Sequence, residues 1–206
     1  MSAGTAGATG APAKAPTEVD EESVGTRFKA TMRRFPATVT VLTAHLDGTD
    51  HGMTATAVTA VSMDPPSLVV CINNRTLLHE MLLNQGGFAV NVLGQRHASV
   101  SDAFSGQVLP EHRFDGPGWS RHAEGMMILD DAHAAVVCRR KAAVPYGTHT
   151  MFIGEVVAAR VDEASRPLLY EDARYHRSHP ASRTRGPCRP GVASTAGPPP
   201  PTGRNP

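Results

Sequence analysis

Cysteine is scarce in this sequence, and its spacing carries no motif. The 206 residues include three cysteines, Cys71, Cys138 and Cys188, and no two of them form a CxxC pair. This spacing argues against a disulfide framework and against a zinc site, and it is typical of a protein kept in a reducing compartment. The sequence therefore predicts a cytoplasmic protein with no bound metal.

The sequence also lacks an excess of charge and a long apolar run. It has 20 Lys and Arg residues against 19 Asp and Glu residues, which gives no electrostatic basis for binding nucleic acid or an acidic membrane surface. No apolar run approaches the roughly 18 residues of a membrane span, and the first residues lack the pattern of a secretory signal. We therefore expect neither nucleic acid nor membrane among its partners.

Both ends of the chain are poor in the large apolar residues that build a core. Residues 1–22 are mostly small residues and Pro followed by acidic residues, and residues 178–206 contain eight prolines and no long apolar residue except Val192. Segments of such composition are expected to be disordered. The sequence predicts one folded domain over residues 23–177 between two tails, and removal of residues 178–206 should leave folding and activity intact.

Strand patterns dominate the middle of the chain. Hydroxyl and aliphatic residues alternate over residues 38–43, as in a half-buried strand, and Asp47-Gly48 predicts a hairpin turn into a second strand that runs to about Met63. Further strands are expected over residues 68–72, 88–93, 134–138 and 151–161, with residues 141–150 joining the last two. Helices are expected over residues 24–34 and 97–104, and after a Thr76 cap with Leu77, Leu78, Met81 and Leu82 as apolar face. Antiparallel neighbours with a few inserted helices favour a small closed or split barrel.

The segment from Gly52 to Pro66 has an unusual composition. It opens with glycine, contains many Ala, Thr and Val residues, and ends in Pro65-Pro66. Small side chains let a ligand approach the backbone, and hydroxyl and N–H groups can hold an anion such as a phosphate. The alternative is an ordinary strand of small residues at a tight packing site, and the segment by itself fits both.

Five stretches between residues 24 and 177 form an ordered set. They are Phe35 to Thr43; Gly52 to Ala57 with Ser62 and Pro65-Pro66; Phe88 to Leu93; Gly147-Thr148-His149 ahead of Gly154-Glu155-Val156; and Pro167 to Tyr170 with Tyr175. In this order they resemble the flavin reductase family of two-component monooxygenase systems. The resemblance implies a mainly β, antiparallel Greek-key fold, the FMN-binding split β-barrel, with a few peripheral helices and a homodimeric assembly.

The resemblance also implies an activity. Members of the family use NADH or NADPH to reduce FAD or FMN, and the reduced flavin diffuses to a partner monooxygenase. Such a hydride transfer needs no protein nucleophile, and the sequence shows no Ser-His-Asp or paired-carboxylate constellation. Two alternatives use the same barrel: a flavin- or haem-binding carrier without turnover, and a related enzyme such as a pyridoxamine-phosphate oxidase-like protein or a corrin reductase.

Position by position, the resemblance assigns residues to three parts of a site. The flavin ring and ribityl chain contact the stretch with Gly52, Met53, Thr54, Thr56 and Ala57, and Cys71, Ile72 and Asn73 line the same site. The phosphate end falls at Thr76, Leu77 and Leu78, flanked by Ala103 and Phe104. His149 is the catalytic histidine, and it forms the nicotinamide site with Tyr146, Gly147 and Thr148.

Several of these residues have a structural alternative. Cys71 is also explained as a small core residue, Phe104 as packing, Thr54 and Thr56 as strand surface, and His149 as an exposed histidine. Thr148 departs from the family, which usually has aspartate there. A carboxylate beside a histidine favours its charged form, whereas threonine supplies a hydrogen bond and no charge.

Overall fold

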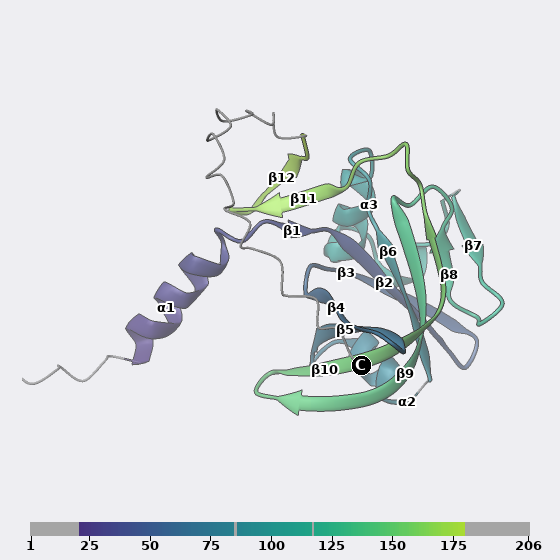
Figure 1. Cartoon of the computed structure of the whole chain (residues 1–206), viewed down its shortest axis with the longest axis horizontal. Helices are drawn as coiled ribbons and strands as arrows, with labels where there is room; N and C mark the ends of the chain where they lie inside the picture. Colours follow the sequence, from purple (N-terminus) through teal and green to yellow (C-terminus); the bar gives the residue numbers. More distant parts are fainter. Residues whose placement is uncertain (1–20, 85, 117, 180–206) are drawn as a thin grey trace, which may run out of the picture.

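The structure, a computed structural model, describes residues 21–84, 86–116 and 118–179 (Figure 1). The tails expected over residues 1–22 and 178–206 lie outside the described residues except for their inner ends, 21–22 and 178–179. The elements of the described chain are α1 (Glu21–Met32), β1 (Ala37–Thr38), β2 (Thr40–Leu46), β3 (Thr49–Ala55), β4 (Val58–Met63), β5 (Pro66–Asn73), α2 (Leu77–Asn84), β6 (Gly87–Val92), α3 (Ala98–Asp102), η1 (Ala103–Gln107), η2 (Pro110–His112), β7 (Trp119–Arg121), β8 (Met127–Leu129), β9 (Ala134–Tyr146), β10 (His149–Val161), β11 (Leu168–Glu171) and β12 (Arg174–Arg177).

A seven-stranded antiparallel sheet forms the body of the molecule. Its strand order is β3-β2-β6-β9-β10-β5-β4, and every neighbouring pair is antiparallel. The two end strands, β3 and β4, follow one another in the chain but are not hydrogen-bonded as neighbours. The sheet therefore curls into a barrel that stays open along one side, which confirms the predicted split barrel.

The barrel interior is filled by aliphatic residues and two phenylalanines. Residues from β2, β5, β6, β9 and β10 surround α2, which contributes Leu78, Met81 and Leu82. Phe88 and Phe152 are both fully buried in this cluster. Leu77, expected on the same apolar face of α2, is instead about half exposed, at 49%.

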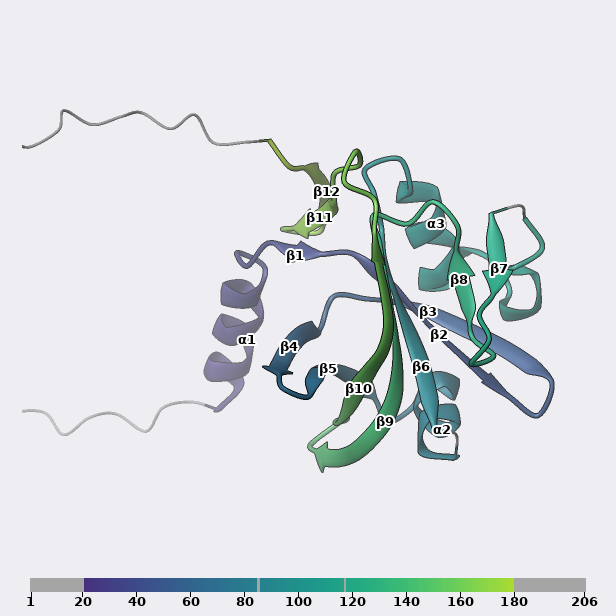
Figure 2. The ribbon, with the colours of Figure 1, turned by 45° about the vertical axis from the view of Figure 1, so that its right-hand side comes forward.

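A second layer covers the outer face of β2. Val39, Val41 and Leu93 pack there against Phe104 and Leu129, and α3, η1 and the β7–β8 hairpin form this layer (Figure 2). Because both faces of β2 are covered, the prediction of a half-buried strand over residues 38–43 is wrong. The buried hydroxyls of Thr40 and Thr43 donate to backbone carbonyls, at 2.6 Å to Ala55 and 2.7 Å to Met127.

Two expected boundaries on the sheet also differ. The strand expected from the Asp47-Gly48 turn to Met63 is split at Thr56 and Ala57 into β3 and β4, which lie at opposite ends of the sheet. Residues 141–150, expected as a connection, belong mostly to a long hairpin whose turn is Gly147-Thr148.

The first helix stands away from the barrel (Figures 1 and 2). It begins at Glu21, three residues earlier than expected, and so includes the last two residues assigned to the N-terminal tail. Its expected apolar face is exposed, at 64% for Phe28, 45% for Met32 and 60% for Phe35, just beyond the helix. In the described part of the chain, no helix has both the length and the apolar character to cross a membrane.

Candidate functional site

The connection between β3 and β4 places several predicted residues at one end of the sheet. The Cys71 N–H donates to the Ala57 carbonyl at 3.0 Å, and on its other side Cys71 is in register with Met151 of β10. Two residues further along β5, Asn73 is in register with His149. Ala57, Cys71, Asn73 and His149 therefore lie across adjacent strands.

The α2 N-terminus follows directly from this end of β5. The Asn73 side chain accepts the Arg75 N–H at 3.0 Å, and the Asn73 carbonyl accepts the Thr76 hydroxyl at 2.9 Å. Thr76 Oγ1 in turn accepts the His79 N–H at 3.3 Å, which confirms the predicted cap. Leu77 and Leu78 then form the first turn, whose N–H groups have no partner within an α-helix.

The turn between β9 and β10 carries the predicted nicotinamide residues. Gly147 has φ of +57°, a left-handed conformation that suits glycine. Tyr146 is 82% exposed, and Thr148 and His149 are also exposed. Thr148 Oγ1 lies 2.9 Å from His149 Nδ1, so a hydroxyl occupies the place beside the ring where the family usually has a carboxylate.

A cavity of about 370 Å³ lies beside Thr54 and Thr56. The wall next to Thr54 comes from the end of α3, where the Ser101 carbonyl accepts the Thr54 hydroxyl at 2.7 Å. Ser105 and Asp102 continue that wall, and Arg174 and Tyr175 of β12 close it. The cavity thus brings together elements that are far apart in the sequence.

Tyr175 joins β12 to α3 inside this cavity. Its hydroxyl donates to Asp102 Oδ1 at 2.6 Å and lies 2.9 Å from Ser101 Oγ. Burial and the hydrogen bond to the Asp102 carboxylate raise the pKa of Tyr175 above its ordinary value. The phenol therefore remains a neutral donor and fixes the carboxylate on the cavity wall.

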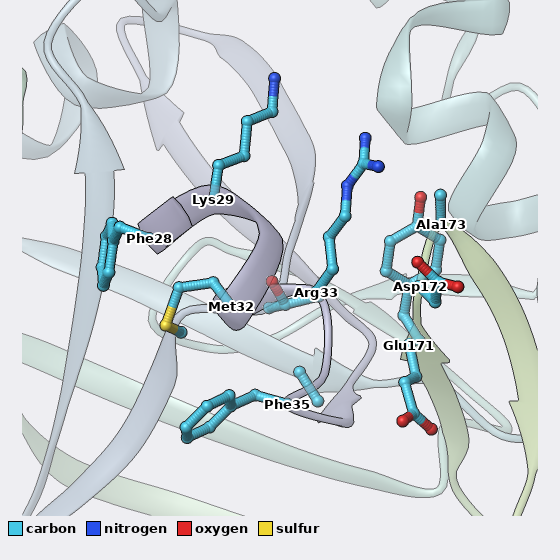
Figure 3. Close-up of a pocket in the computed structure, with 11 residues that line it drawn as sticks. Phe28, Lys29, Met32, Arg33, Phe35, Glu171, Asp172 and Ala173 are labelled. Carbon is cyan, nitrogen blue, oxygen red and sulfur yellow. The ribbon is translucent and has the colours of Figure 1, made fainter. Parts of the chain in front are cut away.

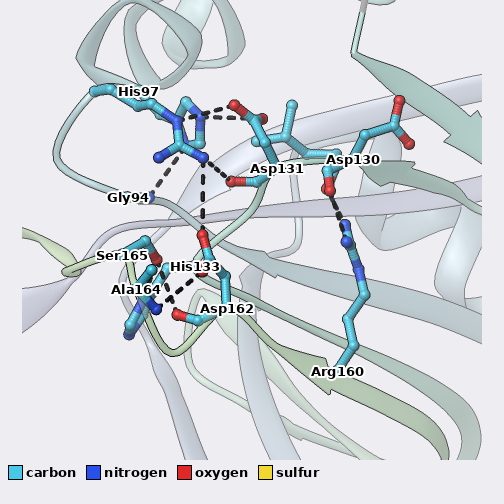
Figure 4. Close-up of polar contacts among 11 residues, drawn as sticks. Gly94, His97, Asp130, Asp131, His133, Arg160, Asp162, Ala164 and Ser165 are labelled. Carbon is cyan, nitrogen blue, oxygen red and sulfur yellow. Dashed lines mark hydrogen bonds and ion pairs between the residues drawn. The ribbon is translucent and has the colours of Figure 1, made fainter.

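The N-terminal end of α3 is held by a buried histidine (Figure 4). His97 Nδ1 accepts the Gly94 N–H at 3.1 Å, and His97 Nε2 lies 3.1 Å from Asp131 Oδ1. Arg96 donates to the same carboxylate at 2.9 Å. Burial opposes ionisation of Asp131, but the neighbouring Arg96 and His97 bring its pKa below the ordinary value. This cluster fixes the helix that supplies the cavity wall.

Four of the predicted flavin residues are buried in packing. Ile72 and Leu78 belong to the barrel core, and Gly52 faces Phe104 so closely that a Cβ on the glycine would lie 2.7 Å from the ring. Phe104 packs against Phe114 and Trp119 with ring centroids 5.1 and 5.2 Å away. This agrees with the alternative prediction that Phe104 is a packing residue. Met53 is half-buried against the barrel core.

The other predicted residues form two groups joined by the connection between β3 and β4. One group, with Ala57, Cys71, Asn73, Thr76 and Leu77, lies near the β9–β10 turn with Tyr146, Gly147, Thr148 and His149. The other, with Thr54 and Ala103, lies at α3, and Thr56 lines the cavity there.

Sequence reasoning missed part of the cavity wall. The missed polar lining residues are Ser101, Asp102, Ser105 and Arg174. Tyr175 was noticed as a motif residue, but its partners lie more than 70 positions away in the sequence, so no local spacing could have identified them. In the described part of the chain, no group of three His, Cys, Asp or Glu side chains is arranged to hold a metal ion.

Known proteins share this architecture and sequence. The chain is 62% identical over 162 residues to the reductase component of an FADH2-dependent resorcinol hydroxylase from Rhizobium sp. strain MTP-10005, covering 78% of this chain and 90% of the relative. It is 35% identical over 149 residues to an NADH-dependent FMN reductase, RutF, of Variovorax paradoxus, covering 72% of this chain and 83% of the relative.

Solved structures agree with these relatives. The NADH:FAD oxidoreductase of Streptomyces globisporus, solved with NAD and FAD fragments, superposes with a TM-score of 0.73 at 28% identity, covering 81% of this chain and 99% of the other. The flavin reductase of the Pseudomonas putida styrene monooxygenase gives a TM-score of 0.67 at 32% identity, covering 74% and 97%. The family model described as "Flavin reductase like domain" matches residues 32–179. The chain belongs to the flavin reductase family.

Proposed function

We propose that this protein is an NADH-dependent flavin reductase that reduces a freely exchanging flavin for a partner monooxygenase. The observation that carries the proposal is the juxtaposition of the Gly147–His149 turn with the end of β5 and the start of α2. Family membership and the names of the relatives support the same reaction class.

The residues at the start of α2 fit the phosphate end of a flavin. The first-turn N–H groups of Leu77 and Leu78 are directed out of the helix end, where the helix dipole favours an anion. The exposed Arg75 adds a positive charge beside them. This donor set suits a phosphate and would serve FMN and FAD alike.

The strands between α2 and the cavity fit the rest of the flavin. Ala57, just before β4, is adjacent to Cys71 of β5, and neither carries a side chain large enough to block a planar ring. Thr54, Thr56 and Asp102 add polar groups around the cavity at the other end. In this assignment the small side chains leave room for the flavin ring, and the hydroxyls and the carboxylate form hydrogen bonds with the ribityl chain.

His149 and its turn would orient the nicotinamide. His149 is exposed and in register with Asn73 of β5, and the Thr148 hydroxyl contact at Nδ1 limits the rotation of its ring. A bound flavin supplies the electron sink, accepting the hydride at its N5. The protein's contribution is to hold the two rings in contact and to exclude water, which is a positioning role rather than acid–base chemistry.

FAD is the flavin we favour, with NADH as the hydride donor. The relative that is 62% identical is the reductase component of an FADH2-dependent hydroxylase of resorcinol. We therefore propose that the partner is a hydroxylase of small phenols, reached by diffusion of the reduced flavin. A cytoplasmic location is part of the proposal, because NADH is supplied there and free thiols such as Cys71 and Cys138 stay reduced.

We further propose that the working form is a homodimer. Phe28, Met32 and Phe35 are exposed together beside a groove of about 430 Å³ between α1 and the β11–β12 turn (Figure 3). Val61 and Met63 of the sheet edge β4 are also exposed, at 52% and 80%. Large apolar side chains gathered in this way indicate a protein interface, and a second copy supplies a matching surface.

The proposed activity is tested by steady-state oxidation of NADH or NADPH with no added flavin, with FAD and with FMN. We expect oxidation that requires added flavin and is fastest with NADH and FAD. His149→Ala should lower kcat/KM for NADH by about tenfold, a loss of about 1.4 kcal/mol, whereas His112→Ala, on an exposed histidine of η2, should leave it unchanged. Tightly bound flavin without turnover of any nicotinamide would instead support the carrier function.

A further inference from the structure

Two backbone segments of the proposed site are joined by a short chain of side-chain hydrogen bonds. The first segment is the loop from β5 to α2, and the second is the Gly147-Thr148 turn that precedes His149. The Asn74 N–H donates to the Thr148 carbonyl at 3.0 Å. The Asn74 side-chain Nδ2 lies within 3.4 Å of the Gly147 carbonyl. One residue of the loop therefore contacts both residues of the turn.

The orientation of the Asn74 amide is fixed by its two neighbours. Nδ2 faces the Gly147 carbonyl, which can only accept, so Oδ1 faces the Thr150 hydroxyl at 3.0 Å and accepts its proton. Exchange of the amide oxygen and nitrogen would place Oδ1 against the Gly147 carbonyl oxygen, acceptor against acceptor. The geometry thus assigns the Thr150 hydroxyl as the donor in this pair.

This assignment extends to His79 of α2. His79 Nε2 lies 2.9 Å from Thr150 Oγ1, and the single hydroxyl proton is already directed at Asn74. His79 must therefore donate through Nε2. The ring is itself held in place, because it packs edge-on against Phe152 of β10 with centroids 5.5 Å apart.

The central hydroxyl of the chain is shielded from water. Thr150 is 3% exposed, whereas His149 beside it and the turn residues are exposed. A buried hydroxyl with one donor and one acceptor partner is costly to disturb, since loss of either leaves a polar group unpaired. The network anchors an exposed turn to a buried point on the strand and to the helix that starts the proposed phosphate site.

We propose that Asn74, Thr150 and His79 are positioning residues that set the Gly147–His149 turn, and with it the nicotinamide, relative to the flavin. The inference rests on the proposed function for its kinetic consequence. None of the three residues needs to touch either ligand. Their effect is to restrict the motion of a glycine-containing hairpin turn. The His149 ring carried by this turn must lie close to the flavin, and small displacements in such sites reduce rates steeply.

The test compares Thr150→Val with two matched variants of the full chain. Thr150→Ser keeps the hydroxyl, and Thr43→Val removes another buried hydroxyl, the one that donates to the Met127 carbonyl far from the turn. We expect Thr150→Val to raise KM for NADH about tenfold while KM for FAD changes less than twofold. Thr150→Ser should have a KM for NADH close to that of the wild type. Thr43→Val should lower the stability of the protein without changing KM for NADH.

A second readout does not depend on turnover. Hydrogen–deuterium exchange of peptides that cover residues 146–150 should accelerate in Thr150→Val and in Asn74→Ala, and not in Thr43→Val. Unchanged exchange in the first two variants would overturn the inference, as would equal kinetic effects of Thr150→Val and Thr43→Val. If the wild-type protein oxidises no NADH with either flavin, the proposed function fails, and the exchange data alone decide whether the network sets the turn.

Discussion

Gly154 occupies a position in the barrel wall where no side chain fits. A Cβ there would lie 2.6 Å from Phe88 Cζ and 2.7 Å from Cys138 Cβ, both of them buried. The ring of Phe88 and the backbone that carries Cys138 have no free space into which to move, because close-packed cores relax only partly. This packing gives a physical reason for the glycine that begins the Gly154-Glu155-Val156 motif.

We expect Gly154→Ala to lower the free energy of unfolding by about 1–3 kcal/mol, the usual cost of overpacking. Urea denaturation followed by circular dichroism measures it. Gly86→Ala is the control, because nothing lies within 4 Å of a Cβ built at Gly86. Equal stability of the two variants would contradict the packing seen around Gly154.

The two described cysteines differ in burial. Cys138 is buried in the core, and burial raises the pKa of its thiol to about 12, so it holds almost no thiolate near neutral pH. Cys71 is half-buried beside Ala57 in the proposed flavin site.

In a chain carrying Cys188→Ser, iodoacetamide should therefore modify Cys71 and leave Cys138 until the protein unfolds. Added FAD should slow the modification of Cys71 severalfold, and mass spectrometry of the peptides measures both rates. A rate at Cys71 that is independent of FAD would contradict the placement of the flavin against β5.

Local sequence patterns predicted some contacts of the site and missed others. The Thr76 cap was predictable because capping depends on residues a few positions apart. The burial of Thr40 and Thr43 was not predictable, because the carbonyl groups of Ala55 and Met127 that accept their hydroxyls come close only in the folded chain. Asp102 was missed for the same reason, because its partner Tyr175 comes from a strand at the far end of the domain.

The β2–β3 hairpin is fastened to β7 by a carboxylate. Asp50 accepts hydrogen bonds from Arg121 at 2.6 and 2.9 Å and lies 2.8 Å from His45 Nδ1. Burial works to raise the pKa of Asp50, but Arg121 and His45 together hold it below the ordinary value of 3.8. The folded state then binds the proton less readily than the unfolded state, so Asp50 stabilises the fold above about pH 3.8 and this contribution is lost as the pH falls through the lower folded value.

We predict that Asp50→Asn lowers the free energy of unfolding near neutral pH by about 1 kcal/mol. The variant should also lose less stability than the wild type when the pH falls below 3.8. Urea titrations at neutral and acidic pH measure both effects. Asp47→Asn, in the exposed turn of the same hairpin, should change neither. A wild-type acid profile retained by Asp50→Asn would refute the assignment.

At the scale of elements, the sequence predicted most strands but not their lengths. Pro145 and Gly147 made residues 141–150 resemble a connection, yet β9 continues to Tyr146. Beyond Arg139, β9 pairs with β10 and no longer with β6. A proline is tolerated there because one side of the strand has no ladder to interrupt. The division between β3 and β4 was equally hidden, since Thr56 and Ala57 continue the composition of both strands.

At the scale of the whole molecule, the apolar face of the first helix is exposed, with Phe28 and Met32 64% and 45% accessible. The proposed homodimer predicts that Phe28→Glu combined with Met32→Glu converts a dimer into a monomer, because two charges would replace the exposed apolar face of α1. Thr26→Glu, at an exposed position of the same helix that does not line the groove, is the control and should remain dimeric. Size-exclusion chromatography with light scattering measures the masses. A monomeric wild type, or a dimeric double variant, would contradict the proposed interface.

The overall fold was the part best predicted from the sequence. The resemblance of five ordered stretches indicated the split barrel, and the seven-stranded open sheet confirms it. The cavity at α3 and the network around Thr150 depend on contacts between distant segments, and neither was visible in local patterns.

The central claim, that the protein reduces a diffusible flavin, is tested most directly by counting flavins. Protein freed of flavin is mixed anaerobically with excess NADH and a large excess of FAD, and the bleaching of FAD absorbance gives the number of flavins reduced per protein molecule. We predict that bleaching continues until the FAD is exhausted, many flavins for each protein. Bleaching that stops at one flavin per protein, or does not occur, would contradict the account.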